Sequence, residues 1–543
     1  MCCVLRSLLK ADRLEPWAAV SQTRLAGKDA MKLTRRNALG LLAAAPLGRR
    51  LRAAAAARLE VARGPFKGTR ESLAAYRVPD WFRDAKFGIW AHWGPQSAAE
   101  DGDWYARNIY IQGSPQYKYH VEHYGHPSKF GFKDVIPTWK GDLFDPDHLV
   151  ELYKKAGAKY FVSMGVHHDN FDLWNSKHTR WNSVNMGPKK DIVGLFKQAA
   201  LKHGLKFGVS DHLWISYKWF AVSHGRDKDG PFAGIAYDGA YPQWADLYHE
   251  AACAKFAGPE VEWNDNGIPD SWKQQWFDRI KDLVDQYQPD LLYTDGPLPF
   301  EDYGLSQVAN LYNLNAAKHR GVTEAVYTSK RPEDCETGTC ALDVERGVPD
   351  QILPNPWQTD TCVGNWHYQR DIKYKTPKTV IDLLVDVVSR NGNLLLNFPL
   401  PNSGAPDAEE LKIVAAITDW MAVNSEGIYG TRPWKIFGEG PGSQVDKKST
   451  FNESSRKPLT AEDVRFTTKG SSLYAFLMGW PKASALIKPL GTASPQAPGK
   501  IENVELLGHK GKLTWSQTDD GLSVTMPLHQ PSQHAVALKV TLA

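Results

Sequence analysis

Imidazole and carboxylate side chains recur at the ends of short apolar runs in this chain. The run Leu291–Thr294, for example, is followed at once by Asp295-Gly296. A carboxylate with imidazoles around it could act as a nucleophile or as a general base. Asp-Gly is also common turn chemistry, so a turn explains this pair equally well when it is taken alone. The residues that share such a position are His92, His167, His168, Asp211, His212 and Asp295, with Trp104 nearby.

The apolar runs are predicted to be strands of one parallel sheet. They are too short for helices, and most of them follow a segment with helical spacing, such as the ones opened by Asp145-Pro146 and by Asp191. Alternating helices and strands favour right-handed crossovers, so we expect a (β/α)8-like barrel with long insertions. An open doubly wound sheet is the alternative, but no glycine-rich phosphate turn follows any strand. The predicted strands span residues 85–91, 159–164, 205–209, 291–294 and 393–398.

The sequence pattern changes near Trp434. Short runs of β-type residues, separated by turns such as Asp520-Gly521, predict an antiparallel β-sandwich at the C-terminus. We therefore divide the chain into a signal or disordered segment (residues 1–57), a (β/α)8-like barrel (58–434) and a C-terminal β-sandwich (435–543).

The N-terminal segment resembles an export signal. Arg35-Arg36 precedes the apolar stretch Ala38–Leu47 and the alanine run Ala53–Ala57, a pattern similar to a twin-arginine signal. A disordered basic tail is the alternative. Export predicts a periplasmic or secreted protein, and in that oxidising setting Cys335 and Cys340 could form a disulfide. No other apolar run is long enough to span a membrane.

The composition narrows the classes of partner. The net charge is only +4, which gives no electrostatic case for binding nucleic acid. Twenty Trp, 21 Tyr and 20 Phe suit a large core, and they also suit a cleft that binds sugar rings. The sequence carries no prediction of the oligomeric state.

The histidines and aspartates at the strand ends can be interpreted in three ways. They could cap loops as ordinary core residues, or they could surround a sugar, with the imidazoles bonded to its hydroxyls. As a zinc site, His92, His167 and His168 would act with Asp169. Consecutive residues of a strand point to opposite faces, so His167-His168 argues against zinc, and we expect no metal. A sugar-binding site would explain why His, Trp and Asp residues gather at one rim of the predicted barrel.

Glycoside cleavage requires a second carboxylate opposite Asp295. Glu345 is the preferred candidate because it follows Cys335 and Cys340, whose disulfide would brace the loop. Arg346 would lower the pKa of Glu345 if the two paired, so Arg346 is expected to bind substrate or Asp295 instead. Glu301 is the second choice. The remaining candidates are Glu262, Asp302, Asp343 and Asp350.

Five ordered motifs together resemble glycoside hydrolase family 29, the α-L-fucosidases. The resemblance runs from about Trp81 to Trp434. Its motifs are Phe87–Gly94 (FGIWAHWG), Val166–Phe171 (VHHDNF), Tyr293–Gly296 (YTDG), Pro356–Asp360 (PWQTD) and Val388–Asn397 (VSRNGNLLLN).

The resemblance implies retaining hydrolysis of α-L-fucosides on a (β/α)8-like domain, without a metal or other cofactor. It implies that Asp295 is the nucleophile, and Glu345 is our choice of acid/base. The expected substrate is a fucosylated oligosaccharide or glycoconjugate. The residues expected to bind it are His92, Trp104, His167, His168, Tyr293 and Trp357.

The chain departs from the family pattern at several positions. Asp103-Trp104 stands where the family often has Glu-Trp, and Tyr293 stands where it often has Trp. Val209–His212 replaces a common Tyr-Tyr-Ser, and Trp357–Asp360 replaces Trp-Glu-x-Cys. Because these positions concern the sugar contacts, a related activity such as α-L-galactoside hydrolysis is one alternative. A carbohydrate-binding protein on a catalytically inactive barrel is another.

Overall fold

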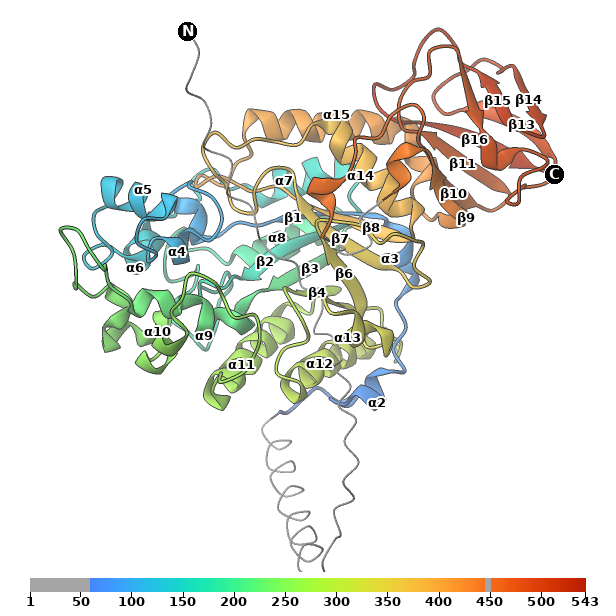
Figure 1. The fold of residues 1–543 in the computed structure, drawn as a ribbon. Helices are drawn as coiled ribbons and strands as arrows, with labels where there is room; N and C mark the ends of the chain where they lie inside the picture. Colours follow the sequence, from blue (N-terminus) through green and yellow to red (C-terminus); the bar gives the residue numbers. More distant parts are fainter. Residues whose placement is uncertain (1–58, 445–450) are drawn as a thin grey trace, which may run out of the picture.

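A closed parallel barrel forms the larger part of the structure. The structure is a computed structural model that describes residues 59–444 and 451–543. Neighbouring strands pair in chain order, and β8 closes on β1. The strands are β1 (Phe87–Ala91), β2 (Tyr160–Val166), β3 (Lys206–Asp211), β4 (Leu291–Thr294), β5 (Val326–Ser329), β6 (Ala341–Glu345), β7 (Trp357–Cys362) and β8 (Gly392–Asn397). The predicted barrel is therefore confirmed (Figure 1).

Helices surround the barrel, and several begin where the sequence predicts a cap. The Asp145 carboxylate accepts from the backbone N–H of His148 at the start of α7, and Asp191 caps α8 in the same way. The helices are α2 (Arg70–Leu73), α3 (Asp80–Ala85), α4 (Tyr105–Asn108), α5 (Pro115–His123), α6 (Phe132–Val135), α7 (Pro146–Lys155), α8 (Ile192–Lys202), α9 (Ser216–Trp219), α10 (Ala245–Tyr248), α11 (Asp270–Tyr287), α12 (Asp302–Lys318), α13 (Pro332–Glu336), α14 (Pro377–Ser389) and α15 (Ala408–Asn424).

Three strands, β5, β6 and β7, were not predicted. β5 has only Val326 and Tyr327 before the polar Thr328 and Ser329, and β6 and β7 carry polar residues such as Asp343, Gln358 and Asp360 among their apolar ones. The side chains of Asp343, Gln358 and Asp360 are buried all the same. A search for apolar runs misses such strands, because their polar groups bond to one another inside the barrel.

The C-terminal domain is an antiparallel β-sandwich, as predicted. One sheet has the strand order β13-β16-β11-β10-β9, and the other has the order β12-β15-β14. The first strand, β9, already begins at Arg432, just before the domain boundary expected from the sequence. The strands are β9 (Arg432–Glu439), β10 (Val464–Lys469), β11 (Ser472–Leu477), β12 (Ser484–Ile487), β13 (Ile501–Leu506), β14 (Trp515–Thr518), β15 (Gly521–Thr525) and β16 (Val536–Leu542).

A buried carboxylate joins the barrel to the C-terminal domain. Asp386 of α14 pairs with Arg390 on the same helix and with Arg456 and Arg465 from the C-terminal part of the chain. Burial would raise the pKa of Asp386, but the three guanidinium groups outweigh it and hold that pKa well below its ordinary value. The carboxylate therefore stays ionised within the domain interface.

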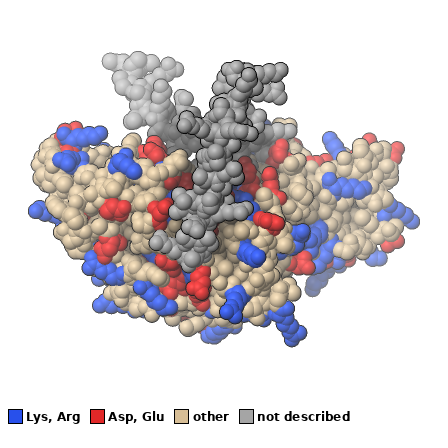
Figure 2. Space-filling model, turned by 90° about the horizontal axis from the view of Figure 1, so that it is seen from below, with Lys and Arg blue, Asp and Glu red and all other residues tan. Residues whose placement is uncertain are grey.

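Two further expectations concern the surface and the N-terminus. Figure 2 shows basic and acidic side chains interspersed over the face seen from below, in keeping with the small net charge. Within residues 59–444 and 451–543, no helix is long and apolar enough to cross a membrane. The expected export signal, residues 1–57, lies outside the described residues.

Candidate active site

Asp295 lies immediately after β4, at the rim where the carboxyl ends of the barrel strands meet. Its backbone N–H donates to the carbonyl of Asp211, at the end of β3. One carboxylate oxygen, Oδ2, lies 3.1 Å from His212 Nδ1 and 3.4 Å from His168 Nε2. The next residue, Gly296, has φ +125° and packs against the Trp214 ring. The Asp-Gly pair thus makes a turn and also presents a carboxylate to the histidines.

The second oxygen of Asp295 is held by a lysine that the sequence analysis missed. Lys330 follows β5, and its Nζ lies 2.8 Å from Asp295 Oδ1. Burial would raise the pKa of Asp295, but Lys330 and the bonds from His168 and His212 hold it well below its ordinary value. Asp295 is therefore ionised at neutral pH. The position of Lys330 directly after a strand could have identified it as a candidate. That strand, β5, was not predicted from the sequence.

Glu345 is the last residue of β6 and shares the same lysine. Its Oε2 lies 2.5 Å from Lys330 Nζ. Burial, together with the negative charges of Asp360 and Asp295, raises the pKa of Glu345 above its ordinary value, although Lys330 opposes this shift. Burial likewise would lower the pKa of Lys330, but the surrounding carboxylates raise it well above its ordinary value. The structure thus brings the two predicted carboxylates together around one ammonium group.

Three of the other acid candidates do not contact Lys330. Asp343 is buried within the barrel, where Gln358 donates to it, and burial raises its pKa well above the ordinary value. Glu301, the second choice for the acid, is paired instead with Arg70 at 2.8 Å on the outside of the barrel. Glu262 pairs with Lys218. Glu345 is therefore the candidate whose carboxylate faces Lys330.

Five histidines form a cluster beside the carboxylates. The expectation that His167 and His168 point to opposite faces is wrong, because both lie in the turn after β2 and their rings are 4.4 Å apart. His92 follows β1, and its ring lies 5.1 Å from that of His167. His212, after β3, was among the strand-end candidates but was assigned no contact with substrate, and His367, whose ring lies 4.8 Å from His92, was not predicted at all. His367 follows the unrecognised β7, so its position gave no signal.

Tryptophans flank His168 on one side. Trp104, at the start of α4, has φ +60°, and its ring lies 6.3 Å from the His168 ring. Trp219 and Trp263 also lie near both Trp104 and His168. Trp104 was expected at the site, whereas Trp219 and Trp263 were not. Because the rings cover an imidazole that contacts Asp295, this side can present an apolar surface to a bound molecule.

Two residues that were expected to bind substrate are buried within the barrel. Trp357 is the first residue of β7, far from its carboxyl end, and it is fully buried with its indole N–H donating to the carbonyl of Arg390. Tyr293 is also fully buried, and its hydroxyl donates to Asp360 at 2.9 Å. The two rings therefore support the barrel, and the sequence could not show this because burial depends on the strand register.

The segment around Glu345 is braced from two sides. The disulfide between Cys335 and Cys340 links α13 to the start of β6. Arg346, expected to bind substrate or Asp295, lies instead 3.7 Å from Glu453, a residue that follows the barrel in the chain. The backbone N–H of Glu453 donates to the carbonyl of Arg346 at 2.9 Å. Glu345 is thus flanked by a disulfide before its strand and by an ion pair after it.

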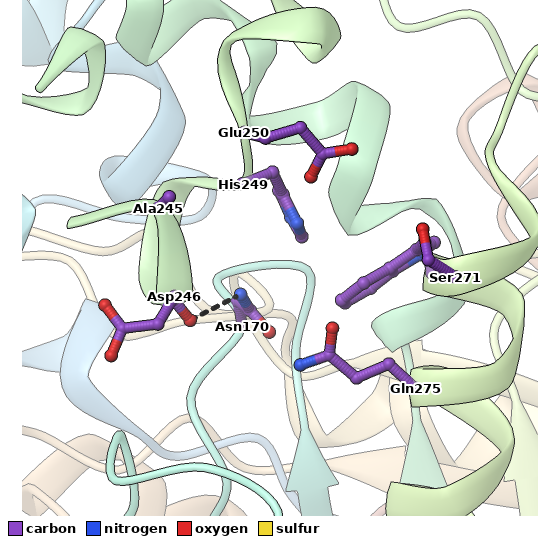
Figure 3. Close-up of a pocket in the computed structure, with 8 residues that line it drawn as sticks. Asn170, Ala245, Asp246, His249, Glu250, Ser271 and Gln275 are labelled. Atoms are coloured by element: carbon purple, nitrogen blue, oxygen red, sulfur yellow. Dashed lines mark hydrogen bonds between the residues drawn. The ribbon is translucent and has the colours of Figure 1, made fainter. Parts of the chain in front are cut away.

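A cavity of about 180 Å³ lies outside the carboxylate group (Figure 3). The Asn170 side chain donates to backbone oxygens of Asp246 and Leu247, and its own oxygen accepts from Arg279. His249 Nε2 lies 2.9 Å from Ser216 Oγ. These polar groups bond to the surrounding loops, and none of the residues that line the cavity belongs to the group of carboxylates and histidines described above. The cavity is lined by Asn170, Ala245, Asp246, His249, Glu250, Ser271, Trp272 and Gln275.

Comparison with known proteins agrees with this architecture. Tissue alpha-L-fucosidase of Bos taurus is 27% identical over 496 residues, which cover 87% of this chain and 90% of the bovine protein. Plasma alpha-L-fucosidase of Homo sapiens is also 27% identical, with 88% of this chain and 92% of the human protein covered. The crystal structure of Thermotoga maritima alpha-fucosidase in complex with fucose has the same fold, with a TM-score of 0.65 at 24% identity. It covers 88% of this chain and 100% of the Thermotoga chain.

Family models extend the comparison over nearly the whole described chain. The model of the alpha-L-fucosidase family matches residues 53–426, and that of the alpha-L-fucosidase C-terminal domain matches residues 456–543. These matches cover both the barrel, with its paired carboxylates, and the β-sandwich. The chain therefore belongs to the α-L-fucosidase family of glycoside hydrolases.

Proposed function

We propose that the protein is a retaining α-L-fucosidase that removes terminal α-L-fucose from glycans by double displacement. The observation that carries the proposal is the bridge from Asp295 through Lys330 to Glu345. The bridged oxygens cannot be farther apart than the two bridging distances combined. That upper limit lies below the separation of ~6.5–9.5 Å typical of inverting glycosidases and is compatible with the ~5–5.5 Å typical of retaining ones.

The two carboxylates have the opposite pKa shifts that this reaction needs. The pKa of Asp295 is lowered, so it is ionised and can attack the anomeric carbon. The pKa of Glu345 is raised, which favours the protonated form required of a general acid. The side chains of Asp295 and Glu345 are 20% and 31% exposed, which leaves both accessible to a substrate.

In the first step, the Asp295 carboxylate forms a covalent β-L-fucosyl ester while Glu345 gives its proton to the departing glycosidic oxygen. In the second step, Glu345, now a carboxylate, takes a proton from water. That water attacks the anomeric carbon and releases fucose and free Asp295. Each step inverts the anomeric carbon, so the overall result is retention.

The residues proposed to hold the sugar are His92, His167 and His168, with Trp104 as an aromatic wall. Burial lowers the pKa of His92 and of His167, so both rings are neutral and can donate to or accept from hydroxyl groups. His168 Nε2 lies 3.4 Å from Asp295 Oδ2, so a sugar hydroxyl that reached this nitrogen would lie beside the nucleophile. Fucosylated oligosaccharides or glycoconjugates are the proposed substrates.

Azide rescue of glycine variants tests the two roles separately. Asp295→Gly should lose nearly all turnover of an aryl α-L-fucoside, and azide should restore a reaction whose product is the inverted β-L-fucosyl azide. Glu345→Gly should still form the covalent ester from an activated aryl fucoside, and azide should then give the retained α-L-fucosyl azide. Glu301→Gly is the matched control, since Glu301 pairs with Arg70 outside the barrel. Near-normal turnover by Asp295→Gly would refute the assignment.

A second candidate activity is hydrolysis of α-L-galactosides. It is favoured by His212 and His367, two imidazoles at the site that the family resemblance did not supply. Comparing kcat/KM for the aryl α-L-fucoside and the aryl α-L-galactoside distinguishes the two activities. Absence of turnover with both would favour a binding protein on an inactive barrel.

We also propose export through the twin-arginine-like segment to the periplasm or outside the cell. The Cys335–Cys340 disulfide supports an oxidising compartment. Fractionation of cells that express the full chain, compared with an Arg35→Lys/Arg36→Lys variant, tests the location. An unchanged distribution of the variant would contradict this route of export.

A further inference from the structure

Three of the clustered histidines converge from separate parts of the barrel. His92 follows β1, His167 follows β2, and His367 follows β7. One ring nitrogen from each can be chosen so that all three lie within 4.8 Å of one another. The ring centroids are 4.8–5.1 Å apart in each pair. All three side chains are buried.

Two of the three histidines carry ring nitrogens that have no partner in the protein. Among the described residues, neither ring nitrogen of His92 has a hydrogen-bond partner, and the same holds for His367 Nε2. Buried polar atoms are nearly always paired in native proteins, so unpaired ones that face each other indicate a missing ligand. A bound molecule that carries hydroxyl groups or other lone pairs would provide partners for these nitrogens. A metal ion with open coordination positions would do so too.

Asp103 holds His367 in the way that is usual for a metal-binding histidine. His367 Nδ1 lies 2.6 Å from the Asp103 carboxylate, so Nδ1 carries the proton and Nε2 keeps its lone pair. The side-chain N–H2 of Gln96 donates to His167 Nδ1 at 2.8 Å, which fixes the orientation of that ring and leaves its proton on Nε2, so His167 must release this proton when Nε2 binds a metal. A carboxylate partner such as Asp103 orients a metal-ligating imidazole and strengthens its binding.

A second triad has less capacity for a metal. His167, His168 and His212 also place ring nitrogens within 4.8 Å of one another. His168 and His212, however, already contact Asp295, and the second nitrogen of each ring has a partner in Ser210 or the backbone of His212. The first triad has free nitrogens, and it is therefore the stronger candidate.

We propose that His92, His167 and His367 form a site for a divalent transition metal such as Zn²⁺, Co²⁺ or Cu²⁺, and that an ion bound there excludes the sugar. Three imidazoles with an open fourth position make a common tetrahedral zinc site, with Zn–N bonds of ~2.0–2.1 Å. Bonds of that length place the three nitrogens ~3.4 Å from one another, and small ring rotations would bring nitrogens that lie within 4.8 Å of one another to that separation. The ion would act as a reversible inhibitor and take no part in hydrolysis. Its competition with sugar rests on the proposed function, whereas its binding does not.

Cobalt absorption measures this site directly. Untagged protein is stripped with EDTA and titrated with Co²⁺, whose visible d–d bands are intense in tetrahedral sites. The wild type should develop these bands with one equivalent of metal. His367→Gln should weaken Co²⁺ binding at least about tenfold, and Asp103→Asn about 10–100-fold, as expected for the loss of an outer partner. Retained circular dichroism shows that each variant is folded.

His249→Ala is the matched control, because His249 is buried but lies outside the triad and bonds to Ser216. It should bind Co²⁺ as tightly as the wild type does. Absence of tetrahedral bands in the wild type would overturn the site, as would equal binding by His367→Gln.

A competition experiment tests the exclusion of sugar. Added L-fucose should weaken Co²⁺ binding to the wild type, and Zn²⁺ should raise KM for an aryl α-L-fucoside with kcat unchanged. Bands that fucose leaves unchanged would overturn the exclusion. If the stripped protein binds Co²⁺ but cleaves no fucoside, the proposed activity fails while the metal site stands, so the two failures are distinguishable.

Discussion

Lys330 Nζ lies 2.8 Å from Asp295 Oδ1 and is the cation that keeps the proposed nucleophile ionised. The same nitrogen lies 2.5 Å from Glu345 Oε2 and 3.6 Å from Asp360 Oδ2. One ammonium group, placed after β5, therefore serves three carboxylates that come from β4, β6 and β7. Its removal should alter both acid–base groups of the proposed reaction.

Replacing Lys330 by methionine should lower kcat/KM for an aryl α-L-fucoside at pH 7 by on the order of 10²-fold, a typical loss for one electrostatic group at a reaction centre. Lys330 lowers the pKa of Asp295, so its loss raises that pKa. The acid limb of the kcat/KM profile should therefore move to higher pH.

The matched control is Lys330→Arg, which keeps a cation at this position. The pH profile of the arginine variant should stay close to that of the wild type, although a change of shape at the bridge can lower kcat. An unmoved acid limb in Lys330→Met would contradict the role of Lys330 as the cation that lowers the pKa of Asp295.

Glu453 is expected to act as a positioning residue for Glu345. It contacts Arg346, the residue after Glu345, and it also pairs with Lys375 at 2.8 Å. Glu453→Gln should lower kcat about 3–10-fold for a natural fucoside, because general acid catalysis depends on closely held geometry. Activated aryl fucosides need less help from the acid and should lose less activity.

The control for Glu453 is Glu502→Gln, at an exposed position on β13. It should leave both substrates unaffected. An equal loss on aryl and natural substrates by Glu453→Gln would point to a general loss of structure instead of a displaced acid.

Asp386 is expected to be central to the stability of the two-domain chain. Asp386→Asn removes the charge that Arg390, Arg456 and Arg465 share in the domain interface. Breaking a buried ion pair costs about 3–5 kcal/mol, so the midpoint of urea unfolding should fall clearly at pH 7. Asp419→Asn, at an exposed position of α15, should leave the midpoint unchanged.

The pH dependence of this contribution has a definite sign. The pKa of Asp386 is lowered in the folded protein, so its contribution is complete above the unfolded pKa of ~3.9 and is lost as the pH falls below it. The difference in unfolding free energy between wild type and Asp386→Asn should be constant from pH 7 to about pH 5 and should narrow in stronger acid. A difference that widened on acidification would contradict the lowered pKa.

Local sequence features determined a large part of the fold. Capping residues such as Asp145 and Asp191 predicted the starts of α7 and α8, and continuous apolar runs predicted β1 to β4 and β8. These signals work because a cap and an apolar run act within a few residues of chain. Five strands and their helices already favoured a barrel.

The tertiary structure alone decided which side chains meet. β6 and β7 are stabilised by polar residues such as Asp343 and Gln358, which bond to each other across strands, and no local pattern reveals that pairing. Lys330 remained unrecognised because it follows β5, in which the polar Thr328 and Ser329 come directly after Val326 and Tyr327 and leave no apolar run. Closure of the barrel brings Lys330 to Asp295 and Glu345.

The direction of each side chain also depended on the closed barrel. The sequence predicted Asp295 and Glu345 as site residues, and the structure brings both carboxylates to Lys330. Trp357 belongs to a motif that resembles the family, yet the register of β7 buries its ring. The physical reason is that residue types set what a side chain can do, whereas strand register and barrel closure set what it can reach.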